Sequence, residues 1–112
     1  LEDYFHLAKE LGMRSLIEVH THDELERALE ISPEIIGVNS RNLKTLDVDA
    51  QAFAELIPQI PSTIARVAES GISTRQEVAF AQECGATAIL VGEALVRSGF
   101  PSVAIDQLLG RL

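Results

Sequence analysis

Two short apolar runs that end at glycine constrain the fold of this chain more than any other feature. They are residues 64–72, which reach Gly71, and residues 86–93, which reach Gly92. A continuous apolar run bounded by turn residues is typical of a strand buried on both faces, as in a parallel sheet. A helical pattern follows each run, so the chain is predicted to alternate strands with helices.

The same alternation extends along the whole chain. Further strands are predicted at residues 15–19 and 35–38, a helix at residues 3–11 precedes them, and a last helix begins near residue 93. The order is one helix followed by four strand–helix units, which implies an α/β fold with a parallel sheet and right-handed crossovers. The helices between strands are predicted to begin at capping residues, namely Thr21 with Glu24, Asp49, and Ser73 with Gln76.

No linker or low-complexity segment divides the 112 residues, so we expect a single domain over residues 1–112. This length falls well short of the roughly 250 residues of a closed (β/α)8 barrel. The net charge of −8 leaves no basic stripe for nucleic acid, and an anionic ligand would need local help from helix ends and cations. One cysteine, Cys84, and the lack of a signal peptide or an 18-residue apolar run lead us to expect a cytoplasmic protein without a membrane partner.

Polar side chains stand at the ends of three predicted strands. Glu18 interrupts the first apolar run, Asn39 and Arg41 follow the second, and Glu69 and Ser70 end the third. The carboxyl ends of parallel strands meet at one edge of the sheet, where such folds place their chemistry. We therefore predict a functional site at that edge.

Each of these residues also has a structural interpretation. Burial would raise the pKa of Glu18 into a range suited to general acid–base work, or the residue would pair with a neighbour such as Arg66. Glu69 has the same catalytic interpretation, with capping of the local turn as the structural one. Asn39 and Arg41 either orient a ligand or satisfy backbone groups of their loop.

The two glycine corners predict an anion site made of backbone. Ser70 and Gly71 form one corner, and Gly92 with the amide of Glu93 forms the other. Glycine lets a ligand approach the main chain closely, and the amides and dipoles of the following helices attract negative charge. Adjacent corners of this kind hold phosphate in the last two units of a (β/α)8 barrel.

A metal site is not predicted. His20 and His22 have a metal-like spacing, but no third ligand of the right kind is placed nearby, and zinc needs three or four. Capping and solvent exposure are the expected roles of this pair.

Four motifs, taken together, resemble the signatures of the indole-3-glycerol-phosphate synthase family. Their order and spacing match throughout, and they cover essentially the whole chain. The resemblance implies a TIM (β/α)8 barrel, of which this chain is the carboxyl-terminal half with strands five to eight. The motifs are residues 16–20 (LIEVH), 36–43 (IGVNSRNL), 67–72 (VAESGI) and 85–95 (GATAILVGEAL).

The resemblance implies a lyase of tryptophan biosynthesis that works without metal or organic cofactor. The family closes the ring of 1-(2-carboxyphenylamino)-1-deoxyribulose 5-phosphate and releases carbon dioxide and water. By position, Glu18 matches the catalytic glutamate of the fifth strand, and Asn39 matches an asparagine that orients the substrate, with Arg41 beside it. Glu69 and Ser70 match the substrate-contacting pair of the seventh strand. The phosphate cradle is matched by Gly71, Gly92 and the amide of Glu93.

One part of the family pattern has no match in this chain. The catalytic lysines of the family come from strands in the first half of the barrel, and Lys9 and Lys44 stand elsewhere. Ring closure needs a general acid, so we expect the chain alone to be inactive or nearly so. The chain begins at Leu1 without a methionine, which we interpret as a piece of something longer.

Two other functions stay open. One is a non-catalytic half barrel that binds phosphate or assembles with itself; exposed strand edges favour self-association or pairing with the missing amino-terminal half. The other is a different phosphate-handling barrel, such as phosphoribosylanthranilate isomerase, against which Glu18 and the polar loop at residues 39–42 argue.

Overall fold

The computed structural model of this chain describes residues 7, 10, 12, 15–42, 44–91, 105, 106 and 108–110. The helices predicted at residues 3–11 and from residue 93 lie largely outside the described residues. Within them, no helix combines the length and the hydropathy needed to cross a bilayer. The elements in chain order are β1 (Leu16–Val19), α2 (His22–Glu30), β2 (Ile35–Asn39), α3 (Gln51–Leu56), the 3-10 turn η1 (Ile57–Gln59), β3 (Ala65–Glu69), α4 (Arg75–Cys84) and β4 (Ala88–Leu90).

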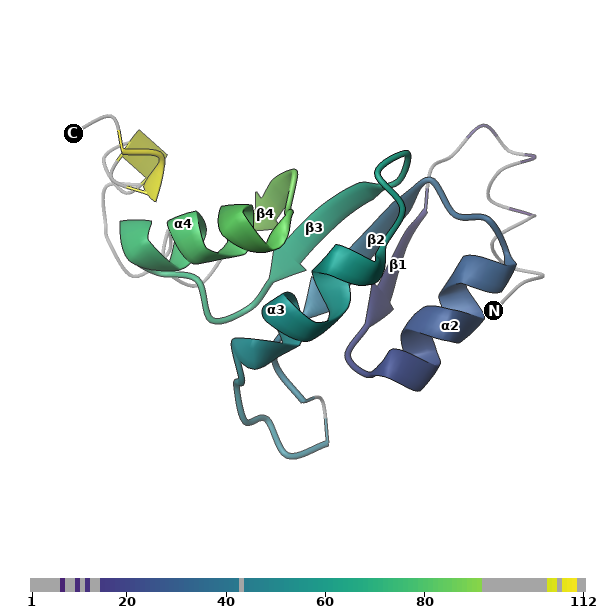
Figure 1. Cartoon of the computed structure of the whole chain (residues 1–112), viewed down its shortest axis with the longest axis horizontal. Coiled ribbons are helices and arrows are strands. Elements are labelled where there is room, and N and C mark those ends of the chain that lie inside the picture. Colours follow the sequence, from purple (N-terminus) through teal and green to yellow (C-terminus); the bar gives the residue numbers. More distant parts are fainter. Residues whose placement is uncertain are drawn as a thin grey trace.

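The four strands form one parallel sheet in the order β1-β2-β3-β4. Each strand therefore pairs with the next strand of the chain, and right-handed crossovers place every intervening helix on the same face. Figure 1 shows α2, α3 and α4 together on that face. Four parallel strands with helices between them on one face match half of a (β/α)8 barrel, which confirms the predicted fold class.

The hydrophobic core lies between the sheet and these helices. Side chains alternate along a strand, so one set faces the helices and the other set faces away from them. The strands contribute residues such as Ile17, Ile36 and Val38 to the core, and Leu25 and Phe53 pack on them from the helices. We call the helix-free side the open face; it carries Leu16, Glu18, Gly37, Asn39, Val67, Glu69, Ala88 and Leu90.

The capping residues show where the sequence prediction was right and where it was wrong. Thr21 and Glu24 form the predicted capping box of α2. Asp49 stands one residue before the cap position of α3, and its Oδ1 accepts a hydrogen bond of 3.0 Å from the N–H of Gln51.

The predicted start of α4 was wrong by one residue. The capping box is formed by Thr74 and Glu77, not by Ser73 and Gln76. The physical reason is the Glu77 carboxylate, which accepts hydrogen bonds from the backbone N–H and the hydroxyl of both Ser73 and Thr74.

Candidate active site

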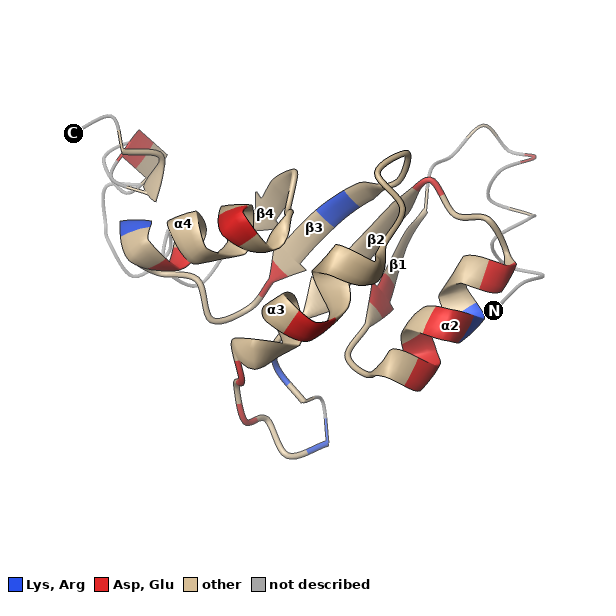
Figure 2. Cartoon of the chain, viewed as in Figure 1, with Lys and Arg blue, Asp and Glu red and all other residues tan. Residues whose placement is uncertain are grey.

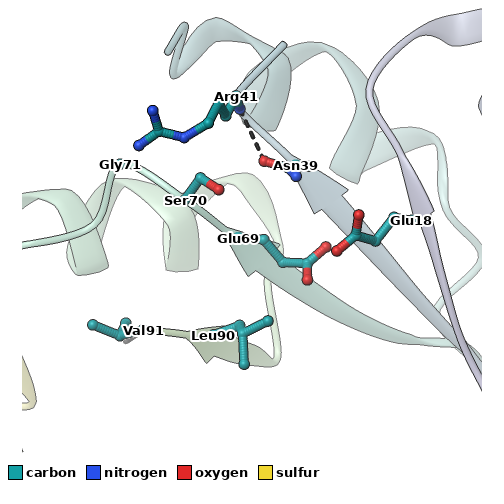
Figure 3. Close-up of a pocket in the computed structure, with 8 residues that line it drawn as sticks. All are labelled: Glu18, Asn39, Arg41, Glu69, Ser70, Gly71, Leu90 and Val91. Carbon is teal, nitrogen blue, oxygen red and sulfur yellow. Dashed lines mark hydrogen bonds between the residues drawn. The ribbon is translucent and has the colours of Figure 1, made fainter. Parts of the chain in front are cut away.

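A pocket of about 400 Å³ opens at the carboxyl ends of the strands. It brings together six of the residues that the sequence analysis assigned to the site, from three different segments of the chain (Figure 3). Leu90 and Val91 close its β4 side. Gly92 and Glu93, the second half of the predicted phosphate cradle, lie outside the described residues. The six are Glu18, Asn39, Arg41, Glu69, Ser70 and Gly71.

Two carboxyl groups face one another at one end of the pocket. Glu69 ends β3 and is 2% exposed, whereas Glu18 on β1 is exposed. β2 runs between these strands, yet the carboxyl groups point toward one another across it (Figure 3). The acidic residues of β1 and β3 are also visible in Figure 2.

The surroundings of Glu69 change its acidity. Burial first, and then the neighbouring side chain and charge of Glu18, together raise the pKa of Glu69 to about 7. Two ionised carboxylates have no donor to share, and accordingly both Oε atoms of Glu69 are buried without a hydrogen-bond partner among the described residues. A donor between the two groups would require a proton on one of them.

Arg66 does not neutralise Glu18, which was the structural interpretation of that glutamate. Arg66 lies on the helix-covered side, and its guanidinium donates to three backbone carbonyls, at 2.6 Å to Gly85, 3.1 Å to Ile64 and 3.3 Å to Pro61. Neighbouring residues on a strand point to opposite faces, so Glu18 and Arg66 stand on opposite sides of the sheet.

Asn39 and Arg41 have the structural role that was considered for them, and both also line the pocket. The Oδ1 of Asn39 accepts a hydrogen bond of 2.9 Å from the N–H of Arg41, so this oxygen orders the loop. The Nδ2 of Asn39 points toward the carboxyl pair, while the Arg41 guanidinium lies toward Gly71 (Figure 3). Arg41 Nη1 also donates to the carbonyl of Leu46 at 3.1 Å. The pocket is therefore acidic at one end and basic at the other.

Three amides around the amino terminus of α4 are already used within its capping box. The amides of Ser73 and Thr74, just before the helix, donate to Glu77, and the amide of Glu77 donates to the Thr74 hydroxyl. An anion at this end of the pocket would meet the Ser70–Gly71 corner and Arg41.

The model of the family described as indole-3-glycerol phosphate synthase matches residues 1–108 of this chain. The chain belongs to the indole-3-glycerol phosphate synthase family. The sequence is 46% identical over 109 residues to the indole-3-glycerol phosphate synthase of Mycolicibacterium vanbaalenii, covering 97% of this chain and 40% of the relative. The synthase of Kineococcus radiotolerans is 48% identical over 101 residues, covering 90% and 37%. The chain thus spans about 40% of the length of these relatives.

Solved structures agree with the fold. The crystal structure of the Amycolatopsis orientalis BexX/CysO complex is 27% identical with a TM-score of 0.67, over 98% of this chain and 49% of that chain. The native KDPGal structure has a TM-score of 0.70 at 21% identity, over 99% and 52%, and it shows the fold alone.

Two residues near the site of this family member have contacts that the sequence analysis did not predict: Ser40 had no assigned role, and His20 was expected only to cap or to be exposed to solvent. Ser40 is 1% exposed; its N–H donates to the carbonyl of Glu69 at 3.0 Å, and its hydroxyl lies 3.0 Å from the carbonyl of Ser70. His20 Nδ1 lies 2.7 Å from the carbonyl of Asn39, so His20 supports the end of β2. In the sequence, a serine in a turn-rich loop and a histidine after a strand carry no signal that distinguishes these roles.

No metal ligands gather near the pocket within the described part of the chain, where no group of three His, Cys, Asp or Glu residues is found. His22 is exposed and pairs with Glu26 at 3.0 Å. Burial, followed by the charge of Glu83, raises the pKa of the Cys84 thiol, as expected for a small apolar residue and not for a nucleophile.

Proposed function

We propose that this chain supplies one half of an indole-3-glycerol phosphate synthase active site. The convergence of Glu18, Asn39 and Glu69 on a pocket with a basic opposite end carries this proposal. The substrate, 1-(2-carboxyphenylamino)-1-deoxyribulose 5-phosphate, needs a place for its phosphate and proton-transferring groups for loss of water. The two ends of the pocket match these needs.

The carboxyl pair would perform the proton transfers. A pKa of about 7 for Glu69 keeps both its protonated and ionised forms populated near neutral pH, which is the condition for acid and base work by one group. We assign the acid–base role in dehydration to Glu18 with Glu69 beside it, orientation of the substrate to Asn39, and substrate contact to Glu69 and Ser70.

The phosphate would lie at the other end of the pocket, against Gly71 and the Arg41 guanidinium. Both Ser70 and Gly71 have a φ of +68°, a left-handed conformation that turns the backbone sharply after β3. Gly92 and the amide of Glu93 complete the cradle in this proposal. No residue of the chain is assigned the general acid of ring closure, so we propose that the chain alone does not turn over.

A steady-state assay tests the proposal. The purified chain is assayed alone and after mixing with the part of the Mycolicibacterium vanbaalenii relative that this chain does not cover, which in this proposal supplies the other half of the barrel. We expect turnover only in the mixture, and we expect Glu18→Gln to abolish it while Glu55→Gln, an exposed carboxyl on α3, leaves it unchanged. Turnover by the chain alone, or no turnover in a mixture that forms a complex, would contradict the proposal.

A second candidate is a non-catalytic half barrel that binds phosphate or associates through its open face. The observation in its favour is that Leu16 and Leu90, on the two outer strands, are 39% and 57% exposed. Binding of inorganic phosphate by a mixture that never turns over the substrate would favour this candidate.

A further inference from the structure

The path of the Glu69 side chain depends on one position of the middle strand. Glu69 is level with Asn39 on β2, and Glu18 is level with Gly37, two residues further back. To face Glu18, the Glu69 side chain must run backward and across β2, over residue 37. A Cβ added at Gly37 would stand 2.9 Å from Glu69 Cδ and closer still to Oε2.

Glycine inside a strand weakens it and often marks a place where another group approaches the backbone closely. At Gly37 two side chains approach the backbone, the Glu69 carboxyl most closely and then Leu16 Cδ2, 2.8 Å from where a Cβ would stand, so the carboxyl occupies space that a side chain at residue 37 would need. We propose that Gly37 is a positioning residue, which holds Glu69 against Glu18 so that the two carboxyl groups share one proton and act as a single acid–base unit. The catalytic use of this unit rests on the proposed function, but the pairing does not.

The other charged groups around Glu69 do not replace this pairing. Of the titratable or charged residues that line the pocket, Glu18 comes from β1 and Arg41 from the loop after β2, while β4 and the residue after it contribute only Leu90 and Val91. Arg41 lies at the far end of the pocket (Figure 3), and no residue that the structure describes forms a hydrogen bond with either Oε of Glu69. A proton held between the two carboxyls is therefore what satisfies Glu69.

The titration of Glu69 tests the pairing without any need for turnover. Carbon-13 NMR of the side-chain carboxyl groups is recorded against pH for the 112-residue chain, for Glu18→Gln, for Gly37→Ala and for the double variant. In the parent chain, Glu18→Gln should lower the titration midpoint of Glu69 from about 7 toward the ordinary 4.5. In the Gly37→Ala background, where Glu69 is displaced from Glu18, the same substitution should leave the midpoint unchanged. Glu55→Gln is the control and should leave the titration midpoint of Glu69 unchanged in both backgrounds.

Two results of this double-mutant cycle would overturn the proposal. An equal effect of Glu18→Gln in both backgrounds, or no effect in the parent chain, overturns the role of Gly37. If Gly37→Ala does not fold by circular dichroism, Glu69→Asp takes its place, because the shorter side chain cannot cross β2. The titration of residue 69 in that variant should then be insensitive to Glu18→Gln, and a sensitive titration overturns the proposal. A negative result of the titration would not change the outcome of the steady-state assay. A negative result of that assay would likewise not change the titration of Glu69.

Discussion

The carboxyl group of Glu69 lies in the space that a side chain at Gly37 would fill. The two residues are 32 positions apart in the sequence and lie on neighbouring strands. The absence of a side chain at residue 37 therefore sets the position of the Glu69 carboxyl. Because residue 37 is glycine, the buried carboxyl of Glu69 can extend over β2. There it faces the carboxyl of Glu18 on β1 (Figure 3). The consequences can be measured on the protein.

The free energy of unfolding should fall as the pH rises from 4.5 to 7. Because the folded-state pKa of Glu69 lies above its ordinary value of 4.5, the folded state binds more protons than the unfolded state in this window, and stability is lost as pH increases. The loss is on the order of 3 kcal/mol at most, since one pKa unit corresponds to about 1.4 kcal/mol. Urea unfolding at the two ends of the window measures it.

Glu69→Gln should remove most of this pH dependence, because a neutral amide does not titrate. Glu55→Gln is the matched control and should keep it. Glu77 does not interfere: although burial alone would raise its pKa, the hydrogen bonds from Ser73 and Thr74 lower it, so its stabilising effect is lost only below pH 4.5. The prediction would be contradicted if the free energy of unfolding changed equally with pH in the parent chain and in the Glu69→Gln variant.

Thr74→Ala should destabilise the chain by about 1 kcal/mol, the usual cost of losing an N-cap hydroxyl. The Thr74 hydroxyl accepts the hydrogen bond from the N–H of Glu77, which no other side chain replaces among the described residues. Ser73→Ala is the control, since its hydroxyl only donates to Glu77, and its cost should be smaller. Chemical denaturation compares the two; a larger loss for Ser73→Ala would place the cap where the sequence first suggested it.

Gly71→Ala should destabilise the pocket corner for two separable reasons. The φ of +68° costs a side-chain-bearing residue about 1–2 kcal/mol, and an added Cβ would stand 2.6 Å from Val48 Cγ1. Val48→Ala removes the contact with the new Cβ but leaves the cost of the positive φ. In the Gly71→Ala/Val48→Ala double variant, it should therefore recover only part of the lost stability. Full recovery, measured by urea unfolding, would show that the conformation carries no cost.

Ser40→Ala should destabilise the chain by about 1–2 kcal/mol, because the buried hydroxyl donates a hydrogen bond to the carbonyl of Ser70 and the variant loses it. The loss should be accompanied by weaker binding of inorganic phosphate, since the Ser70–Gly71 corner loses its support. Ser62→Ala, at an exposed serine, is the control and should change neither quantity. Unchanged phosphate binding in a destabilised Ser40→Ala variant would separate Ser40 from the site.

Leu16→Lys and Leu90→Lys should each weaken association of the chain with itself or with the complementary half. Both leucines lie on the open face, on opposite outer strands, where a partner would bury them. Leu46→Lys is the control, because Leu46 is 63% exposed but stands in the loop after β2. Sedimentation velocity measures the effect; equal behaviour of all three variants would exclude the open face as the contact.

Much of the fold was predictable because its signals are local. The apolar runs at β2 and β3, the capping box at Thr21 and the turn chemistry around Asn39 depend on residues close together in the chain. The one-residue error at α4 arose because Ser73 and Thr74 both have the chemistry of a cap. Which of them caps was decided by the reach of the Glu77 carboxylate.

The sequence by itself determined the alternation of strands and helices, and therefore which residues come to the carboxyl edge of a parallel sheet. It also identified six of the eight residues that line the pocket. Only the tertiary structure decided how they face one another: that Glu69 crosses β2 over Gly37, that Arg66 turns to the other face, and that Ser40 supports the next strand. These relationships depend on lateral register and side-chain direction between strands, which no spacing along the chain specifies.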